Sequence, residues 1–160
     1  GGDYSAANHH IIHDKLTRAL GEKPIAIIEN HHNFAWKEIQ SNGEEWIIHR
    51  KGATPASKGA LGVIPGSMAS PAYIVKGLGN EESLNSAAHG AGRLMSRSAA
   101  KKQFSLKQLQ DHLAEKGITL IGAGIDEAPM AYKNINTVMA EQDDLVKKIA
   151  IFEPKIVKMG

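Results

Sequence analysis

The segment LGVIPGSMASPAYIV, residues 61–75, decides the fold. Its two short apolar runs, Leu61–Ile64 and Ala72–Val75, predict two strands, and the two prolines and one glycine between them are typical of a turn. The surrounding segment, 51–80, is rich in glycine. So much glycine beside short strands favours a backbone that approaches another group closely, although a loop-rich surface explains the composition equally well.

The chain on either side of this segment alternates between helical and strand patterns. Asn42-Gly43 separates two short runs and predicts a hairpin, because both residue types tolerate positive φ. Ser105 is a good N-cap for the helix that follows it. We expect helices at 4–20, 94–102, 106–116 and 136–149, and strands at 24–28, 34–39, 46–48, 118–121 and in the tail 152–160. The pattern predicts a mixed α/β fold of the α+β type, with short, largely antiparallel strands, Gly-rich loops and packed helices.

Composition excludes several classes of function. The 160 residues hold 19 Lys and Arg against 17 Asp and Glu, so the chain has neither a polybasic nor an acidic tail. The lack of cysteine excludes a disulfide scaffold, a Cys-ligated zinc site and a thiol nucleophile. No apolar run approaches the ~20 residues that span a bilayer, and no secretory signal is present. We therefore expect a cytoplasmic protein with no membrane partner.

Positive charge is concentrated locally. Residues 83–110 contain no Asp or Glu, and Arg93, Arg97 and Lys101 follow at intervals of four. A helix would place these three on one face, which suits a phosphate of a nucleotide or of RNA. A solvated helix face is the alternative interpretation.

Eight histidines offer candidate chemistry. His9 and His13 are spaced for chelation on a helix, but a structural or surface role is favoured for them. His32 follows a predicted strand and can ligate Mn²⁺ or Zn²⁺, with an ordinary packed or exposed side chain as the alternative. His89 has small neighbours that leave room around its imidazole, so it can bind a phosphorus or attack it. The sequence contains no P-loop, no Rossmann glycine motif and no His-Glu-x-x-His motif.

Several motifs occur together in a fixed order and cover most of the chain, from about residue 24 to the end. They are His31-His32-Asn33-Phe34-Ala35, His49-Arg50-Lys51-Gly52-Ala53, Ile64-Pro65-Gly66-Ser67-Met68, His89-Gly90-Ala91-Gly92-Arg93 with Met95-Ser96-Arg97, and Ala131-Tyr132-Lys133. This series closely resembles the C-terminal part of the RtcB family of RNA-splicing and RNA-repair ligases. The resemblance implies that residues 1–160 are the C-terminal portion of an RtcB-like ligase domain.

The resemblance also implies a reaction. The family uses GTP and Mn²⁺ to join an RNA 2′,3′-cyclic phosphate or 3′-phosphate end to a 5′-hydroxyl end, as in tRNA splicing and RNA repair. It implies that His89 is the guanylylated nucleophile and that His32 is a metal ligand. Asn33 is then expected to face the substrate or to support the metal ligand.

The remaining site residues follow in the same way. The resemblance assigns nucleotide contacts to Ser67, to the backbone around Ala91 and Gly92, and to Tyr132 and Lys158, the last reaching the guanine base. Arg93 and Arg97 are candidate RNA or phosphate contacts, chosen mainly from their charge. Ala72 stands where some members have a serine, and the loss of one hydrogen bond there weakens binding by about 1 kcal/mol.

The family's other metal ligands, including a cysteine, come from sequence upstream of the matched part and are absent here. We therefore expect the chain alone to be an incomplete ligase that needs the N-terminal part as its partner. The alternative is a non-catalytic module that binds RNA or a nucleotide. A Mn²⁺-dependent phosphoesterase is disfavoured, because the chain has no paired Asp/Glu cluster.

Overall fold

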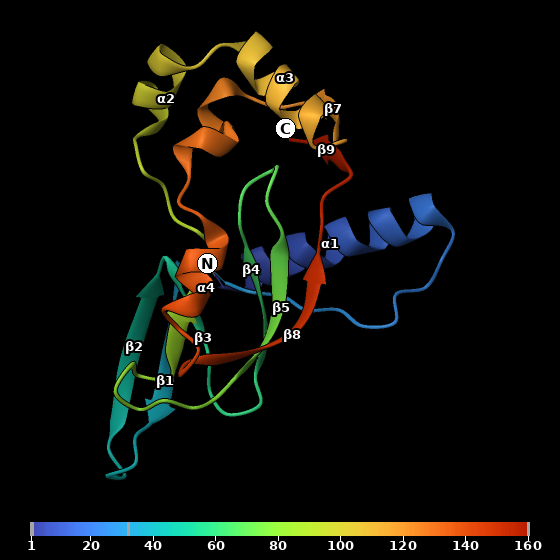
Figure 1. Ribbon diagram of the computed structural model, residues 1–160. Coiled ribbons are helices and arrows are strands. Elements are labelled where there is room, and N and C mark those ends of the chain that lie inside the picture. Colours follow the sequence, from blue (N-terminus) through green and yellow to red (C-terminus); the bar gives the residue numbers. More distant parts are fainter. Residues whose placement is uncertain (1, 32, 160) are drawn as a thin grey trace.

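A three-stranded antiparallel sheet lies at the centre of the fold (Figure 1). The computed structural model describes residues 2–31 and 33–159. In this sheet β5 (Ala72–Gly77) pairs with β4 (Leu61–Pro65) on one side and with β8 (Val146–Phe152) on the other. The two strands predicted at 61–64 and 72–75 and the mixed α+β class are confirmed, and the two strands pair with each other.

Two apolar clusters form the core. One packs α4 (Ile135–Ala140) against the central sheet through Ile64, Tyr73 and Met139. The other joins α3 (Leu106–Glu115) to the parallel pair of β7 (Thr119–Gly122) and β9 (Ile156–Lys158). Burial of each large apolar side chain contributes about 1.5–3 kcal/mol.

The remaining elements surround this centre. Antiparallel β1 and β2 form the hairpin that projects at the lower left of Figure 1, and its turn includes Gly43 at φ +83°. Ser105 caps α3 through a complete capping box, as predicted. The bounds of the elements not given above are α1 Gly2–Leu20, β1 Asn33–Ile39, β2 Glu45–Lys51, β3 Ala53–Pro55, β6 Ser86–Ala88, α2 Arg97–Gln103, and the 3-10 turns η1 Ile125–Glu127 and η2 Pro129–Ala131.

Three sequence-based boundaries are wrong. Residues 24–28 form no strand, and no strand in the described ranges pairs with them. The helix expected at 136–149 ends at Ala140, and residues 146–152 form β8, since pairing with β5 satisfies their backbone groups. The helix expected at 94–102 begins only at Arg97, where the Ser96 side chain accepts a hydrogen bond from the backbone N–H of Ala99.

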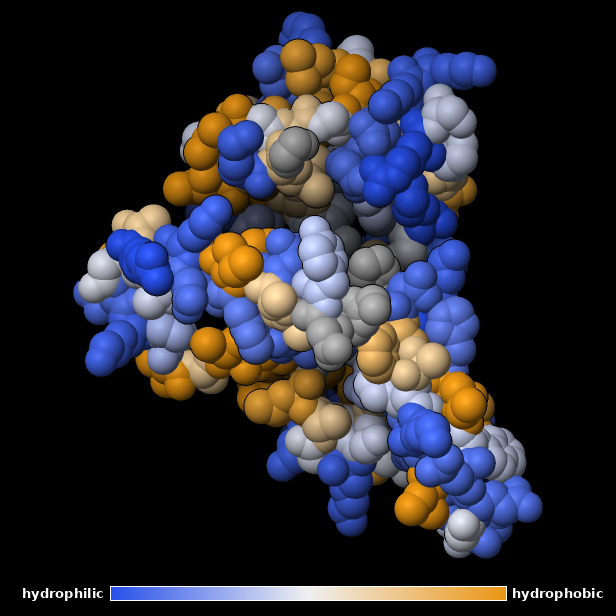
Figure 2. All heavy atoms as spheres, turned by 180° about the vertical axis from the view of Figure 1, so that it is seen from behind, coloured by the Kyte–Doolittle hydropathy of each residue, from blue (hydrophilic) through white to orange (hydrophobic). Residues whose placement is uncertain are grey.

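Large hydrophobic side chains remain at the surface. Figure 2 shows them as separate patches between hydrophilic residues on the face seen from behind. The first helix, α1, exposes Ile11, Ile12, Leu16 and Leu20. Across the described ranges, 2–31 and 33–159, no helix has both the length and the hydropathy to cross a membrane.

Candidate active site

The turn between β4 and β5 forms one wall of the candidate site. The backbone N–H of Gly66 donates to the carbonyl of Pro71 at 3.0 Å, and the N–H of Ser70 donates to the carbonyl of Ser67 at 3.1 Å. A Cβ on Gly66 would lie 2.7 Å from the Cβ of Ser70, so only glycine fits this turn. The turn therefore holds Ser67 in place by backbone geometry.

The segment that follows β6 lies against this turn. The N–H of His89 donates to the carbonyl of Gly52 at 3.2 Å, and the N–H of Ala91 donates to that of Pro65 at 3.0 Å. A Cβ on Gly90 would come within 3.0 Å of the same Pro65 carbonyl oxygen, so a larger residue would push the two segments apart. Gly92 adopts φ +74°, a conformation that side chains rarely tolerate.

A cavity of about 560 Å³ opens between these two segments. That volume falls within the usual 300–1,000 Å³ of small-molecule sites. The cavity brings together five residues that the sequence analysis proposed, namely Ser67, His89, Gly92, Arg97 and Tyr132. Its lining also includes Gly52 and Met68, which lie in the quoted motifs without an assigned role, and Glu127 and Met159, which no motif indicated.

Two predicted nucleotide contacts lie outside this lining. Ala91 is 4% exposed and packs in the central core cluster behind the cavity. Lys158 ends β9, next to Met159, which does line the cavity. The Lys158 Nζ lies 3.9 Å from the position that a Cβ on Gly122 would occupy. Its predicted contact with the guanine base remains a prediction.

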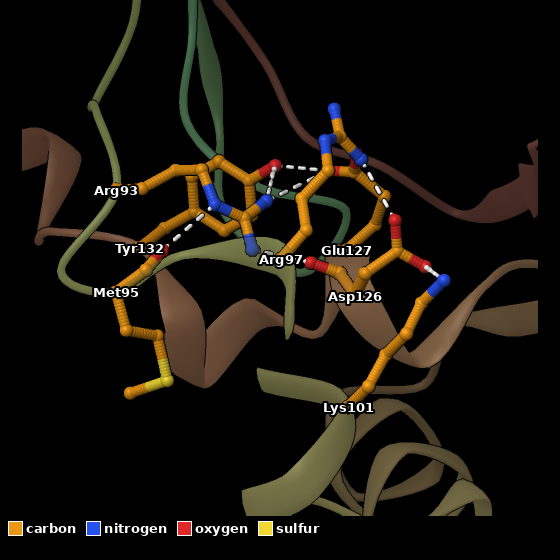
Figure 3. A network of polar contacts seen from close by, with 7 residues as sticks. All are labelled: Arg93, Met95, Arg97, Lys101, Asp126, Glu127 and Tyr132. Atoms are coloured by element: carbon orange, nitrogen blue, oxygen red, sulfur yellow. Dashed lines mark hydrogen bonds and ion pairs between the residues drawn. The ribbon is translucent and has the colours of Figure 1, made fainter. Parts of the chain in front are cut away.

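The Arg93 side chain is held in place by hydrogen bonds to other residues of the chain (Figure 3). Its guanidinium donates to the Met95 carbonyl at 3.0 Å, the Asp126 carbonyl at 2.5 Å and the Tyr132 hydroxyl at 3.0 Å. It also lies 4.9 Å from the centre of the Tyr132 ring. Arg93 therefore ties Tyr132 to η1, and a role as an RNA contact requires these bonds to rearrange.

The basic stripe is also paired with carboxylates. Arg97 Nη1 donates to Asp126 Oδ2 at 2.8 Å and to Glu127 Oε1, and Lys101 Nζ lies 3.6 Å from Asp126 Oδ1. These hydrogen bonds hold the pKa of Asp126 below its ordinary value and raise that of Arg97. Because α2 begins at Arg97, Arg93 does not share its helical face. Arg93, Arg97 and Lys101 nevertheless lie close to the same two acids, Asp126 and Glu127. Both acids lie outside residues 83–110, the segment without Asp or Glu.

Tyr132 forms another part of the cavity wall. Burial raises the pKa of its phenol, and the hydrogen bond that the phenol donates to Glu127 raises it further. The hydroxyl is therefore neutral and remains a donor at physiological pH. Glu127 was missed from the sequence, since no motif marks it and only its contacts with Arg93, Arg97 and Tyr132 identify it.

The predicted metal ligand, His32, lies outside the described residues. Among residues 2–31 and 33–159 no group of three or more His, Asp or Glu side chains is placed to hold a metal ion. His13 Nδ1 lies 3.0 Å from Glu29 Oε1, and the His9 ring stacks on His31 at 5.5 Å between centroids. These contacts agree with the structural role favoured for His9 and His13. Asn33 forms a 2.8 Å hydrogen bond with His49 Nε2.

Comparison with known sequences agrees with the motif series. The family described as "tRNA-splicing ligase RtcB" matches residues 1–160. The chain is 52% identical over 122 residues to the RNA-splicing ligase RtcB of Escherichia coli K12, covering 76% of this chain and 30% of that protein. It is 31% identical over 178 residues to RtcB of Mycobacterium tuberculosis, covering 95% and 41%. A tRNA-splicing ligase RtcB of Methanocaldococcus jannaschii is 37% identical over 129 residues, covering 67% and 13%.

The chain thus spans about a third of the length of the curated relatives from Escherichia coli. The match includes the turn at Ser67 and the segment at His89, the two pieces of backbone that form the cavity. The chain belongs to the RtcB family of tRNA-splicing ligases.

Proposed function

We propose that this chain is the nucleophile-bearing part of a GTP-dependent RNA ligase that joins RNA 3′-phosphate or 2′,3′-cyclic phosphate ends to 5′-hydroxyl ends. The observation that carries the proposal is the cavity of about 560 Å³, in which His89, Ser67, Gly92 and Tyr132 meet. Family membership supports RNA ligation as the reaction class.

His89 is the group that changes covalently. A neutral ring nitrogen of His89 attacks the α-phosphorus of GTP, so that a P–N bond forms as the bond to the leaving pyrophosphate breaks. An oxygen of the RNA 3′-phosphate then attacks the same phosphorus and breaks the P–N bond. The 5′-hydroxyl of the second RNA end finally attacks the phosphorus of the RNA 3′-phosphate, so that the new P–O bond forms as the bond to GMP breaks, and its proton passes to solvent. A 2′,3′-cyclic phosphate end enters this sequence after water has opened it to the 3′-phosphate.

The surrounding residues position these groups. Ser67 presents a hydroxyl at the cavity, on a turn that glycine keeps tight. Tyr132 contributes a neutral ring and hydroxyl, which Arg93 and Glu127 hold in orientation. Fixed donors of this kind lose little entropy on binding a ligand, which favours a well-oriented attack.

Manganese does not fit the described residues alone. No group of three ligands is present in ranges 2–31 and 33–159, and a single histidine holds a divalent ion weakly. We therefore propose that other ligands come from a polypeptide corresponding to the remaining part of the relatives. That part would be the partner of this chain, together with RNA.

Transfer of labelled GMP tests the proposal. The chain is incubated with α-labelled GTP and Mn²⁺, with and without the upstream segment of the Escherichia coli relative. We expect an acid-labile label on the chain only in the mixture, and none with His89→Ala. The matched control is His10→Gln, an exposed histidine on α1, which should be labelled normally. Label that survives His89→Ala, or no label in the mixture, would overturn the proposed nucleophile. Label on the chain alone would overturn the need for upstream ligands.

The second candidate is a non-catalytic module that binds RNA or a nucleotide. The absence of a three-ligand metal group among the described residues favours it. It predicts salt-dependent RNA binding that His89→Ala does not change, with no covalent label in any mixture.

A further inference from the structure

A second cavity, of about 270 Å³, shares Tyr132 with the cavity at His89. It lies between the end of α3 and the start of α4. The polar residues that line it are Ser70, His112, Lys116, Tyr132, Lys133, Asn134 and Asn136. We call it the basic pocket.

The charged side chains that line the basic pocket are all basic. Lys116 and Lys133 line it, together with His112, and none of its lining residues is an Asp or Glu. A neighbouring hollow shares Lys116 and is also lined by Glu153 and Lys155. A ligand in the basic pocket therefore meets positive charge without a competing carboxylate, which favours an anion.

The pocket also holds donors that the fold leaves available. Lys116 Nζ donates to the carbonyl of Ala69 at 3.1 Å, which uses one of its three N–H groups. Within the described ranges, Lys133 has no ion pair. Asn136 Oδ1 accepts from the Tyr73 hydroxyl at 2.6 Å, and its side-chain N–H groups donate to no partner among the residues that the structure describes. Several N–H donors on the lining of one small cavity favour the binding of a phosphate.

Two contacts connect the basic pocket to the cavity at His89. The Ser67 and Ser70 hydroxyls lie 2.9 Å apart, and each lines a different cavity. The Tyr132 ring lines both. A volume of about 270 Å³ is below the usual range for a whole small-molecule ligand, and it suits one phosphate with part of a sugar.

We propose that the basic pocket binds a backbone phosphate of the RNA strand whose reactive end lies at His89. This inference rests on the proposed ligase function, because it takes the occupant of the neighbouring cavity from that function.

Salt-dependent RNA binding tests the inference. A short fluorescent RNA with a 3′-phosphate is titrated with three forms of the chain, from about 25 to 200 mM salt. The forms are wild type, Lys116→Gln/Lys133→Gln, and Lys102→Gln/Lys107→Gln, which removes the same charge from exposed positions on α2 and α3. We expect the pocket variant to bind roughly tenfold more weakly at low salt. The slope of log K against log salt should fall by about 0.7, as expected for one lost phosphate contact on a single strand. In the control variant, the changes in affinity and in salt slope should each be less than half of those in the pocket variant.

Two further arms locate the source of the phosphate. Binding of GTP should be unchanged in the pocket variant, and inorganic phosphate at constant ionic strength should compete with RNA only weakly. Equal losses for GTP and RNA would assign the pocket to the nucleotide and overturn the inference. Lys133→Gln alone is the second variant, because it removes no bond of the folded protein and should still lower the slope.

Failure of this inference is distinguishable from failure of the ligase proposal. RNA binding that is equal in the pocket variant and the control, or absent in wild type, overturns the inference. The ligase proposal is judged by covalent GMP on His89, a separate measurement that these lysines do not touch.

Discussion

Two basic regions meet at Tyr132, and they differ in what balances their charge. The three cations Arg93, Arg97 and Lys101 are paired with two carboxylates, those of Asp126 and Glu127 (Figure 3). The basic pocket, with Lys116 and Lys133, is lined by no acid. In the sequence the first region looks the more basic, since it lies in a segment free of Asp and Glu. The positive charge that is available to a ligand therefore depends on which acids the fold places beside a basic segment.

The largest expected difference between the two regions is in stability. Arg93→Met should lower the free energy of unfolding by about 2–3 kcal/mol, because it removes three hydrogen bonds and leaves Glu127 without one partner. Lys133→Gln should stay within about 0.5 kcal/mol of wild type. Urea unfolding of both variants measures the difference, and equal effects would contradict the division into a paired and an unpaired region.

The next effect concerns RNA binding, and it rests on the proposed function. Asp126→Asn/Glu127→Gln should raise RNA affinity roughly tenfold at low salt, because it releases Arg97 and Lys101 for phosphates. Glu141→Gln/Asp143→Asn removes the same charge from exposed positions and is the control. Fluorescence anisotropy compares the two. Equal gains would show that only net charge matters.

A smaller effect is expected in the titration of Asp126. A hydrogen bond from Arg97 holds the pKa of this carboxyl below its ordinary value, so Arg97→Gln should raise that pKa toward its ordinary value. A lowered carboxyl pKa stabilises the folded state at pH values above the ordinary pKa of Asp. This stabilisation is lost as the pH falls through the lower pKa of the folded state. Carboxyl NMR shifts followed against pH measure the change. The control, Lys107→Gln, leaves Asp126 unaffected, and an unchanged Asp126 pKa in Arg97→Gln would contradict the pairing.

The smallest effect is expected at Tyr132. Glu127→Gln should lower the pKa of the Tyr132 phenol, yet leave it above its ordinary value, because burial is the larger cause of the shift. The difference in phenolate absorbance between each protein and its Tyr132→Phe counterpart isolates this group from Tyr4 and Tyr73. A pKa that returns fully to about 10 would mean that Glu127, rather than burial, controls it.

Local patterns predicted the elements whose signals are short-range. The hairpin around residues 42–43, the cap at Ser105 and the strands at 61–75 all appear where expected. The end of α4 was not predictable in this way. Residues 146–152 carry a helical apolar pattern but pair with β5, some 70 residues earlier in the chain. The local pattern of apolar residues does not reveal pairing with a strand so distant in the sequence.

In the candidate site, too, residues marked by local motifs were predicted and residues defined by distant contacts were not. His89, Ser67, Gly92 and Tyr132 were found from motifs, and the structure places all four on one cavity. Glu127 and the basic pocket were not found, because each depends on contacts between segments with no shared motif.

The sequence by itself determined the family, the nucleophile expected at His89 and the mixed α+β class, because motifs, turn residues and short apolar runs are local properties. Only the tertiary structure decided which cations are available to a ligand. Asp126 and Glu127 return to Arg93 and Arg97 from about 30 residues away, whereas no acid returns to line the pocket of Lys116 and Lys133. Electrostatic pairing acts through space over a few ångströms, so the fold, rather than the order of residues, sets it.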